Sequence, residues 1–266
     1  MLEYKNLELG GCYHQAPMSY PALLSWGEKK AEQFAPYITD TGNYIAAALS
    51  NHQKVVLEAQ LGAMRDIDYG IFPYTSSSST ISAYGPIGAG IPGTLPDHIV
   101  GVLKAYSTCV GAGPFTAEKA MPEKWMESLR KSGGEYGAAT GRPRRVGPFD
   151  AVASAYGLKC QNADKIALTK LDVLSRMDEI PVITAYKLND ELITEFDPLD
   201  DLDSMTPVIQ TLPGWNTDIS KCRKYEELPE NARKYIETLE HLLNHEIQFI
   251  SVGAERNQYL TKGEWL

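Results

Sequence analysis

The residues best suited to chemistry are Thr169, Lys170, Leu171 and Asp172, which follow the apolar run Ile166–Leu168. This run is typical of a buried strand, so the polar residues are expected at its carboxyl end. The two oxygens of Asp172 can accept hydrogen bonds from N1–H and the 2-amino group of guanine, and adenine presents neither donor there. The apolar stem of Lys170 can lie along the purine face while its ammonium stays in water. The stretch therefore predicts recognition of guanine.

The phosphate-binding loop that usually accompanies a guanine-binding motif is missing from this sequence. No G-x-x-x-x-G-K-[ST] occurs in the 266 residues. A four-residue motif also recurs by chance, and the strand context favours the functional interpretation.

A glycine- and arginine-rich loop, residues 137–145, is the second candidate. Gly141 lets the backbone approach a ligand, and Pro143 stiffens the segment. Arg142, Arg144 and Arg145 are suited to bidentate contacts with phosphate or carboxylate. A solvated basic turn explains the same pattern equally well.

Two weaker candidates precede these. Residues 54–59 are predicted to form a strand covered on both faces, and Glu58–Gly62 follow at its end, where an open α/β sheet commonly binds ligands. The serines at 76–79 could donate hydroxyls to a phosphate. On their own, both segments are better explained as a strand-end turn and a solvated loop.

Composition excludes several classes of protein. The net charge of −9 argues against nucleic acid as a partner. The N-terminus lacks the apolar segment of a signal peptide, and no apolar run approaches the ~18 residues of a membrane span. The four cysteines form no C-x-x-C pair, which predicts a reducing, cytoplasmic location and no zinc site.

His241 and His245 lie four apart, but no third metal ligand accompanies them, so an exposed helix face is expected and no metal site is predicted.

The remaining pattern predicts helices and strands in alternation. Residues 1–53 are expected to be helical and peripheral, with Asp40 or Thr41 as an N-cap. A long loop at 69–94 is expected to be ordered by its aromatic and proline residues. Further helices are predicted at 123–131, 150–158 and 229–244, strands at 165–171 and 247–253, and a hairpin from 181 to 196 turning at Asn189–Asp190.

Taken together, several segments resemble the adenylosuccinate synthetase family. The resemblance runs from about Lys54 to about Arg256. It is carried by Asp66–Gly70, Phe72–Tyr74, Leu103–Thr108, Val110–Phe115, Glu135–Gly137, Thr140–Arg145, Leu168–Leu174, Leu212–Trp215 and Ile250–Gly253, all in the family's order. Residues 1–53 match only loosely.

The resemblance implies a ligase that joins IMP to L-aspartate using GTP and Mg²⁺. The 6-oxygen of IMP is first phosphorylated, and the aspartate amino group then displaces that phosphate, so positioning and electrostatics carry the catalysis. It also implies a three-layer α/β fold with a largely parallel central sheet and helices on both faces, of the P-loop NTPase-like kind. Residues 54–266 would form the C-terminal part of that domain, and the chain would form a homodimer.

The family's binding residues carry over by position. The GTP site would comprise Arg144, Lys170, Leu171, Asp172, Ser251, Val252 and Gly253. IMP would contact Leu61, Ser76 and Arg142. The loop that holds aspartate would be Ala138, Ala139, Thr140, Gly141, Arg142, Pro143 and Arg144.

The sequence departs from the family at three of these positions. Leu61 stands where the family has a glutamine that reads the IMP base, and Ala139 and Val252 each replace a threonine. The family's phosphate loop, with its catalytic aspartate and histidine, has no counterpart here, so no catalytic residue is assigned and most magnesium ligands are expected to be missing.

These departures leave three interpretations. The chain is a synthetase-type enzyme with weak or no activity alone; or it is a non-catalytic guanine-nucleotide-binding module that complements an N-terminal half or regulates a full-length enzyme; or it is a related ligase with a different purine or amino acid substrate.

Overall fold

The computed structural model describes residues 1–263 and 265, and the chain divides into two units. One comprises Met1–Val56 with Ala89–Ile91, and the other comprises Leu57–Gly88 with Pro92–Leu266. Each unit is considered by itself below.

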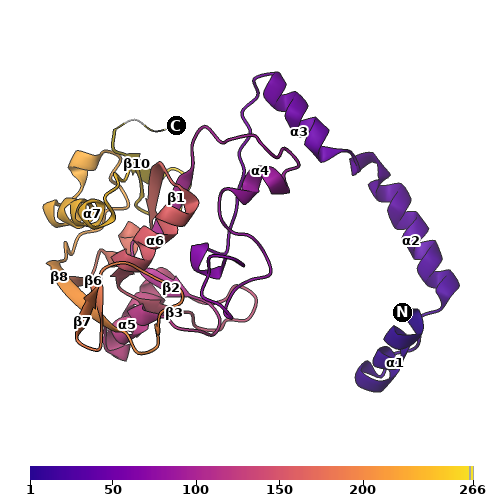
Figure 1. Ribbon diagram of the computed structural model, residues 1–266, viewed down its shortest axis with the longest axis horizontal. Coiled ribbons are helices and arrows are strands. Elements are labelled where there is room, and N and C mark those ends of the chain that lie inside the picture. The colour runs from indigo at the N-terminus through magenta and orange to yellow at the C-terminus, as the bar shows by residue number, and fades with distance from the viewer. Residues whose placement is uncertain (264, 266) are drawn as a thin grey trace. The chain divides into compact units, whose positions relative to one another are not determined.

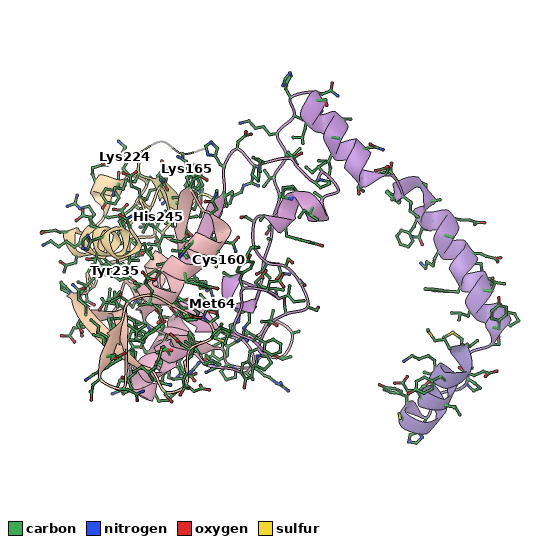
Figure 2. All side chains as sticks on the ribbon, viewed as in Figure 1. Met64, Cys160, Lys165, Lys224, Tyr235 and His245 are labelled. Atoms are coloured by element: carbon green, nitrogen blue, oxygen red, sulfur yellow. The ribbon has the colours of Figure 1, made fainter. Side chains whose placement is uncertain are left out.

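The first unit is helical, as predicted. Its helices are α1 (Leu2–Tyr13), α2 (Tyr20–Phe34) and α3 (Thr41–Ser50), with a short 3-10 turn at Ala35–Tyr37. Capping explains where two of them begin: Ser19 Oγ accepts a hydrogen bond from Ala22 N at 3.3 Å, and Asp40 Oδ1 accepts one from Asn43 N at 3.0 Å. None of the three helices has a buried residue. Figure 2 shows that many side chains project from these helices.

The prediction of a strand at residues 54–59 is wrong. This stretch is irregular and exposed throughout, and the side chain of Val56 is 89% accessible. A strand with two apolar faces requires neighbouring strands and covering layers, and no described strand pairs with this segment. The apolar residues of this stretch therefore lie outside every sheet of the described chain.

The central sheet of the second unit has four strands in the order β1–β5–β9–β10. Figure 1 labels its two edge strands, β1 and β10. The four strands are β1 (Val100–Lys104), β5 (Lys165–Thr169), β9 (Phe249–Ser251) and β10 (Tyr259–Thr261). The first three run parallel, with Leu168 opposite both Leu103 and Ile250, and β10 is antiparallel to β9. The largely parallel sheet of an α/β fold is thus present, and the strands predicted at 165–171 and 247–253 are confirmed in shortened form.

A second sheet contains the predicted hairpin. Its strands are β4 (Phe149–Asp150), β6 (Glu179–Leu188), β7 (Glu191–Ile193) and β8 (Thr206–Pro213). Asn189 and Asp190 both have positive φ, as a tight two-residue hairpin requires. β8 pairs antiparallel with β6 and was not predicted from the sequence. A separate ladder joins β2 (Ser107–Cys109) to β3 (Arg145–Gly147).

The three predicted helices of this unit are confirmed as α5 (Glu123–Gly133), α6 (Ala151–Gln161) and α7 (Glu230–Leu243), and a short α4 (Tyr84–Gly88) lies within the predicted loop. Four 3-10 turns complete the elements: Ala63–Arg65 (η2), Thr116–Lys119 (η3), Leu171–Leu174 (η4) and Tyr225–Glu227 (η5). α6 lies so close to β1 that a Cβ on Gly101 would approach Leu158 Cδ2 to 2.5 Å, so a larger residue there would require the Leu158 side chain to move.

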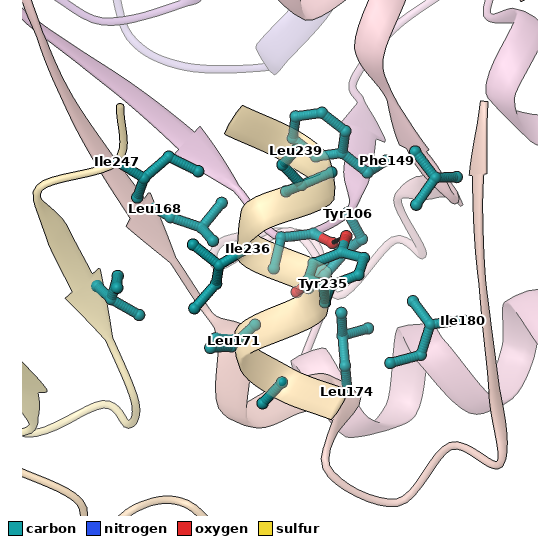
Figure 3. Close-up of a cluster of buried hydrophobic side chains, with 14 of the residues drawn as sticks. Tyr106, Phe149, Leu168, Leu171, Leu174, Ile180, Tyr235, Ile236, Leu239 and Ile247 are labelled. Atoms are coloured by element: carbon teal, nitrogen blue, oxygen red, sulfur yellow. Dashed lines mark hydrogen bonds between the residues drawn. The ribbon is translucent and has the colours of Figure 1, made fainter. Parts of the chain in front are cut away.

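The core of the unit forms around α7. Ala232, Tyr235, Ile236, Leu239 and Leu243 recur at helical spacing and are all buried. Figure 3 shows this stripe facing Leu168, Leu171 and Leu174, which belong to β5 and the η4 turn. Each such side chain stabilises the fold by about 1.5–3 kcal/mol when it is fully buried. This packing fixes the end of β5, where the guanine motif lies.

Candidate functional site

The carboxyl ends of three parallel strands meet at one edge of the central sheet. β1 ends at Lys104, β5 at Thr169 and β9 at Ser251. Open α/β sheets bind ligands at this edge, because the loops that follow the strands converge there. The structure therefore brings together Lys170–Asp172 and Ser251–Gly253, which lie far apart in the sequence.

Lys170 occupies a left-handed conformation, φ 61° and ψ 31°, directly before η4. Its ammonium donates hydrogen bonds to Gly133 O at 2.7 Å and to Glu135 Oε1 at 3.1 Å. A buried carboxylate thus binds the Lys170 ammonium, while 38% of the side chain stays exposed. The lysine is held in place by the protein before any ligand arrives.

Asp172 lies in η4 and is half-buried. Burial raises the pKa of this carboxyl and Asp218 raises it further, while the residue's own backbone N–H and Lys170 lower it. Among the described residues, no side chain donates a hydrogen bond to it. Its acceptor oxygens are thus available to a ligand with paired donors. The neighbouring Leu171 is fully buried in the core, so its side chain supports the turn.

The loop after β9 is held by local hydrogen bonds. Ser251 Oγ donates to Gly253 O at 3.0 Å, and Val252 N donates to Gln258 O at 2.9 Å. The Val252 side chain is fully buried, so it contributes to the core. A Cβ on Gly253 would approach the Gln258 side chain to 2.2 Å, which explains the glycine. Ser251 as a residue is partly exposed.

Glu135 is the central residue of this edge and was not assigned a role from the sequence. It is fully buried, and Oε1 accepts hydrogen bonds from Tyr106 Oη at 2.7 Å, Lys104 Nζ at 3.0 Å and Lys170 Nζ at 3.1 Å. Its second oxygen, Oε2, accepts one from Arg144 Nη1 at 3.0 Å. These five residues, Lys104, Tyr106, Glu135, Arg144 and Lys170, are called the Glu135 cluster.

Electrostatics in the Glu135 cluster are strongly perturbed. Burial alone raises the pKa of Glu135, but the hydrogen bonds from Tyr106 and Lys104 outweigh this effect and lower the pKa to about 2. Burial lowers the pKa of Lys104, and its two neighbouring cations act in the same direction. One carboxylate thus offsets three positive charges.

The three arginines of the second loop have different environments. Arg142 is exposed, whereas Arg144 binds Glu135. Arg145 forms a two-point ion pair with Glu118 and donates to Gly113 O at 2.7 Å. The hypothesis that all three guanidiniums await an anion is therefore wrong for Arg145, which fastens β3 to η3. A cavity of about 420 Å³ lies beside Arg144 and Arg145, between them and α5.

The predicted aspartate loop forms a small exposed hairpin. Gly137 N donates to Arg142 O at 2.8 Å, and Gly141 N donates to Gly137 O at 2.8 Å. Gly141 has φ 64°, and residues 138–143 are all exposed. The hairpin stem ends in Glu135 and Arg144, where Arg144 N donates to Glu135 O at 2.9 Å. The loop is therefore anchored in the Glu135 cluster.

The residues predicted to contact IMP are not joined by any hydrogen bond of the described chain. Leu61 has φ 81° and is 51% exposed, in an irregular stretch. Ser76 Oγ bonds locally with the backbone of Ser78, at 3.1 Å to both its N and its O. Buried Asp66 organises this region, because Thr80 N, Asp68 N and Tyr69 N all donate to its carboxylate at 2.6–3.0 Å.

No group of three or more His, Cys, Asp or Glu able to hold a metal lies within residues 1–263 or at residue 265. In the same part of the chain, no helix is long and apolar enough to cross a membrane.

Comparisons with known proteins agree with one another. The family model for adenylosuccinate synthetase matches residues 1–260. The chain is 41% identical over 258 residues to adenylosuccinate synthetase of Carboxydothermus hydrogenoformans, covering 97% of this chain and 60% of that protein. It is 36% identical to that of Staphylococcus saprophyticus, covering 99% and 62%. The solved structure of fully ligated adenylosuccinate synthetase from Plasmodium falciparum superimposes with a TM-score of 0.86 at 34% identity, covering 97% of this chain and 62% of the other.

Two consequences follow from these matches. Similarity begins at residue 1 and reaches residue 260, so the expectation that residues 1–53 match only loosely is wrong. The chain spans about 60% of the length of the curated relatives it matches.

Proposed function

Because this chain belongs to the adenylosuccinate synthetase family, we propose that the sheet edge at Lys170, Asp172 and Ser251 binds the guanine base of GTP. The family consists of ligases of purine nucleotide biosynthesis. In the proposed role, GTP, IMP and L-aspartate are the ligands, and the product is adenylosuccinate. The proposed setting is the cytoplasm, as a homodimer or together with a complementing N-terminal half.

The observation that carries this proposal is the environment of Asp172. Its half-buried carboxylate has no side-chain donor among the described residues, whereas the neighbouring Lys170 ammonium already donates to Gly133 O and to Glu135. A partly desolvated acceptor gains most from a ligand that brings two parallel N–H donors, as guanine does. Ser251 adds an adaptable hydroxyl at the end of the adjacent strand.

The remaining predicted residues support the other ligands. The exposed hairpin at 138–143 offers backbone N–H groups and the Arg142 guanidinium for the carboxylates of aspartate, and Arg142 also reaches toward IMP in this proposal. Arg144, held by Glu135, would contact GTP. Ser76 would bind IMP through its hydroxyl. Magnesium is generally required in this family, and in the proposed role it would accompany GTP.

We propose further that this chain alone has weak or no synthetase activity. Leu61 has no hydrogen-bonding side chain at the position where the family's glutamine reads IMP, and its backbone is in the left-handed region. Ala139 likewise lacks the threonine hydroxyl of the aspartate loop. Robust conversion of IMP, aspartate and GTP by the purified chain, followed by adenylosuccinate absorbance, would contradict this.

The test of the base site is a change of nucleotide preference. Calorimetry of the wild-type chain should show tighter binding of GTP than of ATP. Asp172→Asn should weaken GTP binding roughly hundredfold and strengthen XTP binding, because an amide can donate to the 2-oxygen of xanthine. Asp218→Asn removes a nearby charge without touching the proposed base contact and serves as the control.

Two alternatives are outcomes of the same measurements. GTP binding that depends on Asp172, with no turnover in the presence of any complementing half, supports a non-catalytic guanine-nucleotide-binding module. Turnover with another purine nucleotide or amino acid in a substrate panel supports a related ligase. Equal affinity for ATP and GTP contradicts the base site in every version.

A further inference from the structure

Glu135 connects two elements to which the proposed function assigns different ligands. They are the turn expected to bind guanine and the hairpin expected to hold aspartate. One carboxylate oxygen binds Lys170, which directly precedes the turn carrying Asp172. The other oxygen binds Arg144, which closes the stem of the exposed hairpin at 138–143. The two contacts are 3.1 and 3.0 Å long, so one carboxylate binds both partners at the same time.

The backbone around Glu135 reinforces this connection. Glu135 N donates to Arg130 O at the end of α5, and Glu135 O accepts from Arg144 N, both at 2.9 Å. Lys170 also donates to Gly133 O, two residues before Glu135. Glu135 and its neighbours thus join three elements: the end of α5, the hairpin stem and the turn after β5.

The charges explain why a carboxylate is needed at this position. Lys104, Arg144 and Lys170 bring three positive charges to a site whose centre is fully buried. Without the anion, these cations would repel one another in a medium that screens charge poorly. A neutral glutamine could accept from the lysines through its oxygen, but its amide group would face the Arg144 guanidinium donor to donor.

Resting on the proposed function, we propose that Glu135 is a positioning residue that couples the guanine-binding turn to the hairpin expected to hold aspartate. It contacts neither ligand itself. It fixes Lys170 and Arg144 together, so that a change at one element is transmitted to the other through a single buried carboxylate.

The experiment is a double-mutant cycle on nucleotide binding by the full chain. Glu135→Gln should weaken GTP binding by about tenfold, within the range expected for energetic coupling through a contact network. Lys170→Met should also weaken it. The Glu135→Gln/Lys170→Met double variant should lose less GTP affinity than the sum of the two single losses, because part of the Glu135 effect acts through the Lys170 ammonium.

Tyr106→Phe is the matched control. It removes one buried hydrogen bond to Glu135 but releases no cation, so it should lower the unfolding temperature without changing GTP affinity by more than about twofold. If Glu135→Gln does not fold, Glu135→Asp keeps the charge but cannot reach both partners, and the same cycle is run with it. Hydrogen exchange at 136–143 should then rise in the Glu135 variant and stay unchanged in Tyr106→Phe.

The outcomes separate the two proposals. If the wild-type chain prefers GTP over ATP but the Glu135 variant binds GTP as tightly as wild type, or if the losses in the cycle are additive, the coupling role alone is overturned. If the wild-type chain shows no preference for GTP, the base site itself fails, and the role of Glu135 fails with it.

Discussion

Two apolar runs of similar composition have opposite environments in this molecule: one is buried and the other is exposed. Ile166–Leu168 lies in β5, where each residue is at most 7% exposed, whereas Val55 and Val56, predicted to lie in a strand as well, are 36% and 89% exposed. The difference is the presence of neighbours, because β5 pairs with β1 on one edge and β9 on the other. An apolar run reports the capacity to form a buried strand, but membership of a sheet depends on segments elsewhere in the chain.

The same contrast extends to the residues that follow each run. After β5, Lys170 and Asp172 lie on a turn fixed by the core and by Glu135. After residues 54–59, Leu61 is half-exposed with φ 81°, in a stretch without regular structure. A binding residue is only as well placed as the element before it, so the guanine edge is the better-defined half of the proposed site.

The largest expected effect is on the free energy of unfolding, and it is seen by making one substitution in each of the two apolar runs. Leu168→Ala should lower the free energy of unfolding by about 2–5 kcal/mol, because it leaves a cavity in the core around α7. Val56→Ala should change it by no more than about 0.5 kcal/mol, since its side chain is already in solvent. Urea unfolding followed by circular dichroism measures both. A large loss in the Val56 variant would show that this segment has a packed partner.

A second expected effect separates the arginines of the loop. Arg145→Ala should lower the free energy of unfolding by about 1–3 kcal/mol, because it leaves Glu118 and the Gly113 carbonyl without their donor. Arg142→Ala should leave stability within about 0.5 kcal/mol and alter only ligand binding. Equal stability of the two variants in thermal unfolding would contradict the structural role assigned to Arg145.

Much of the fold could be read from local pattern. The helices at 123–133 and 230–243 follow from apolar periodicity, and the turn at Asn189–Asp190 follows from residues that tolerate positive φ. β8 was missed because its residues are mostly half- or fully exposed, so its sequence lacks the apolar signal of a buried strand. Its pairing with β6 is a long-range property.

The binding residues of the candidate site could be proposed from the sequence, but the residues that support them could not. The acceptor geometry of Asp172 depends on its own chemistry and on the strand before it, and both are visible in the sequence. The role of Glu135 is not, since a single glutamate before a glycine-rich loop gives no sign of the lysines at 104 and 170 that it meets. Likewise, Arg145 could not be distinguished from Arg142 until its partner Glu118 was placed.

The pKa values of Glu135 and Asp172, two carboxyls on the same edge, are shifted in opposite directions, and each shift predicts how stability depends on pH. The pKa of Glu135 is lowered to about 2, so its contribution to stability is present above the unfolded value near 4.5 and is lost as the pH falls from there toward 2. Comparing urea unfolding of the wild-type chain and Glu135→Gln from pH 7 to pH 3 should show their difference shrinking in the acid part of this range. A constant difference would contradict the ionised state of Glu135.

The smallest expected effect concerns Asp172 without ligand. Burial raises its pKa, so the folded chain holds this proton more tightly than the unfolded chain, and the ionised carboxyl lowers stability at neutral pH. Asp172→Asn should therefore unfold at a slightly higher temperature than wild type at pH 7, and the gap should close as the pH falls through the raised pKa. Saturating GTP should reverse the order, because only the wild-type carboxylate gains the two base donors. A variant less stable than wild type in both conditions would show that Asp172 has a structural partner, and the contrast between the two carboxyls of this edge would be lost.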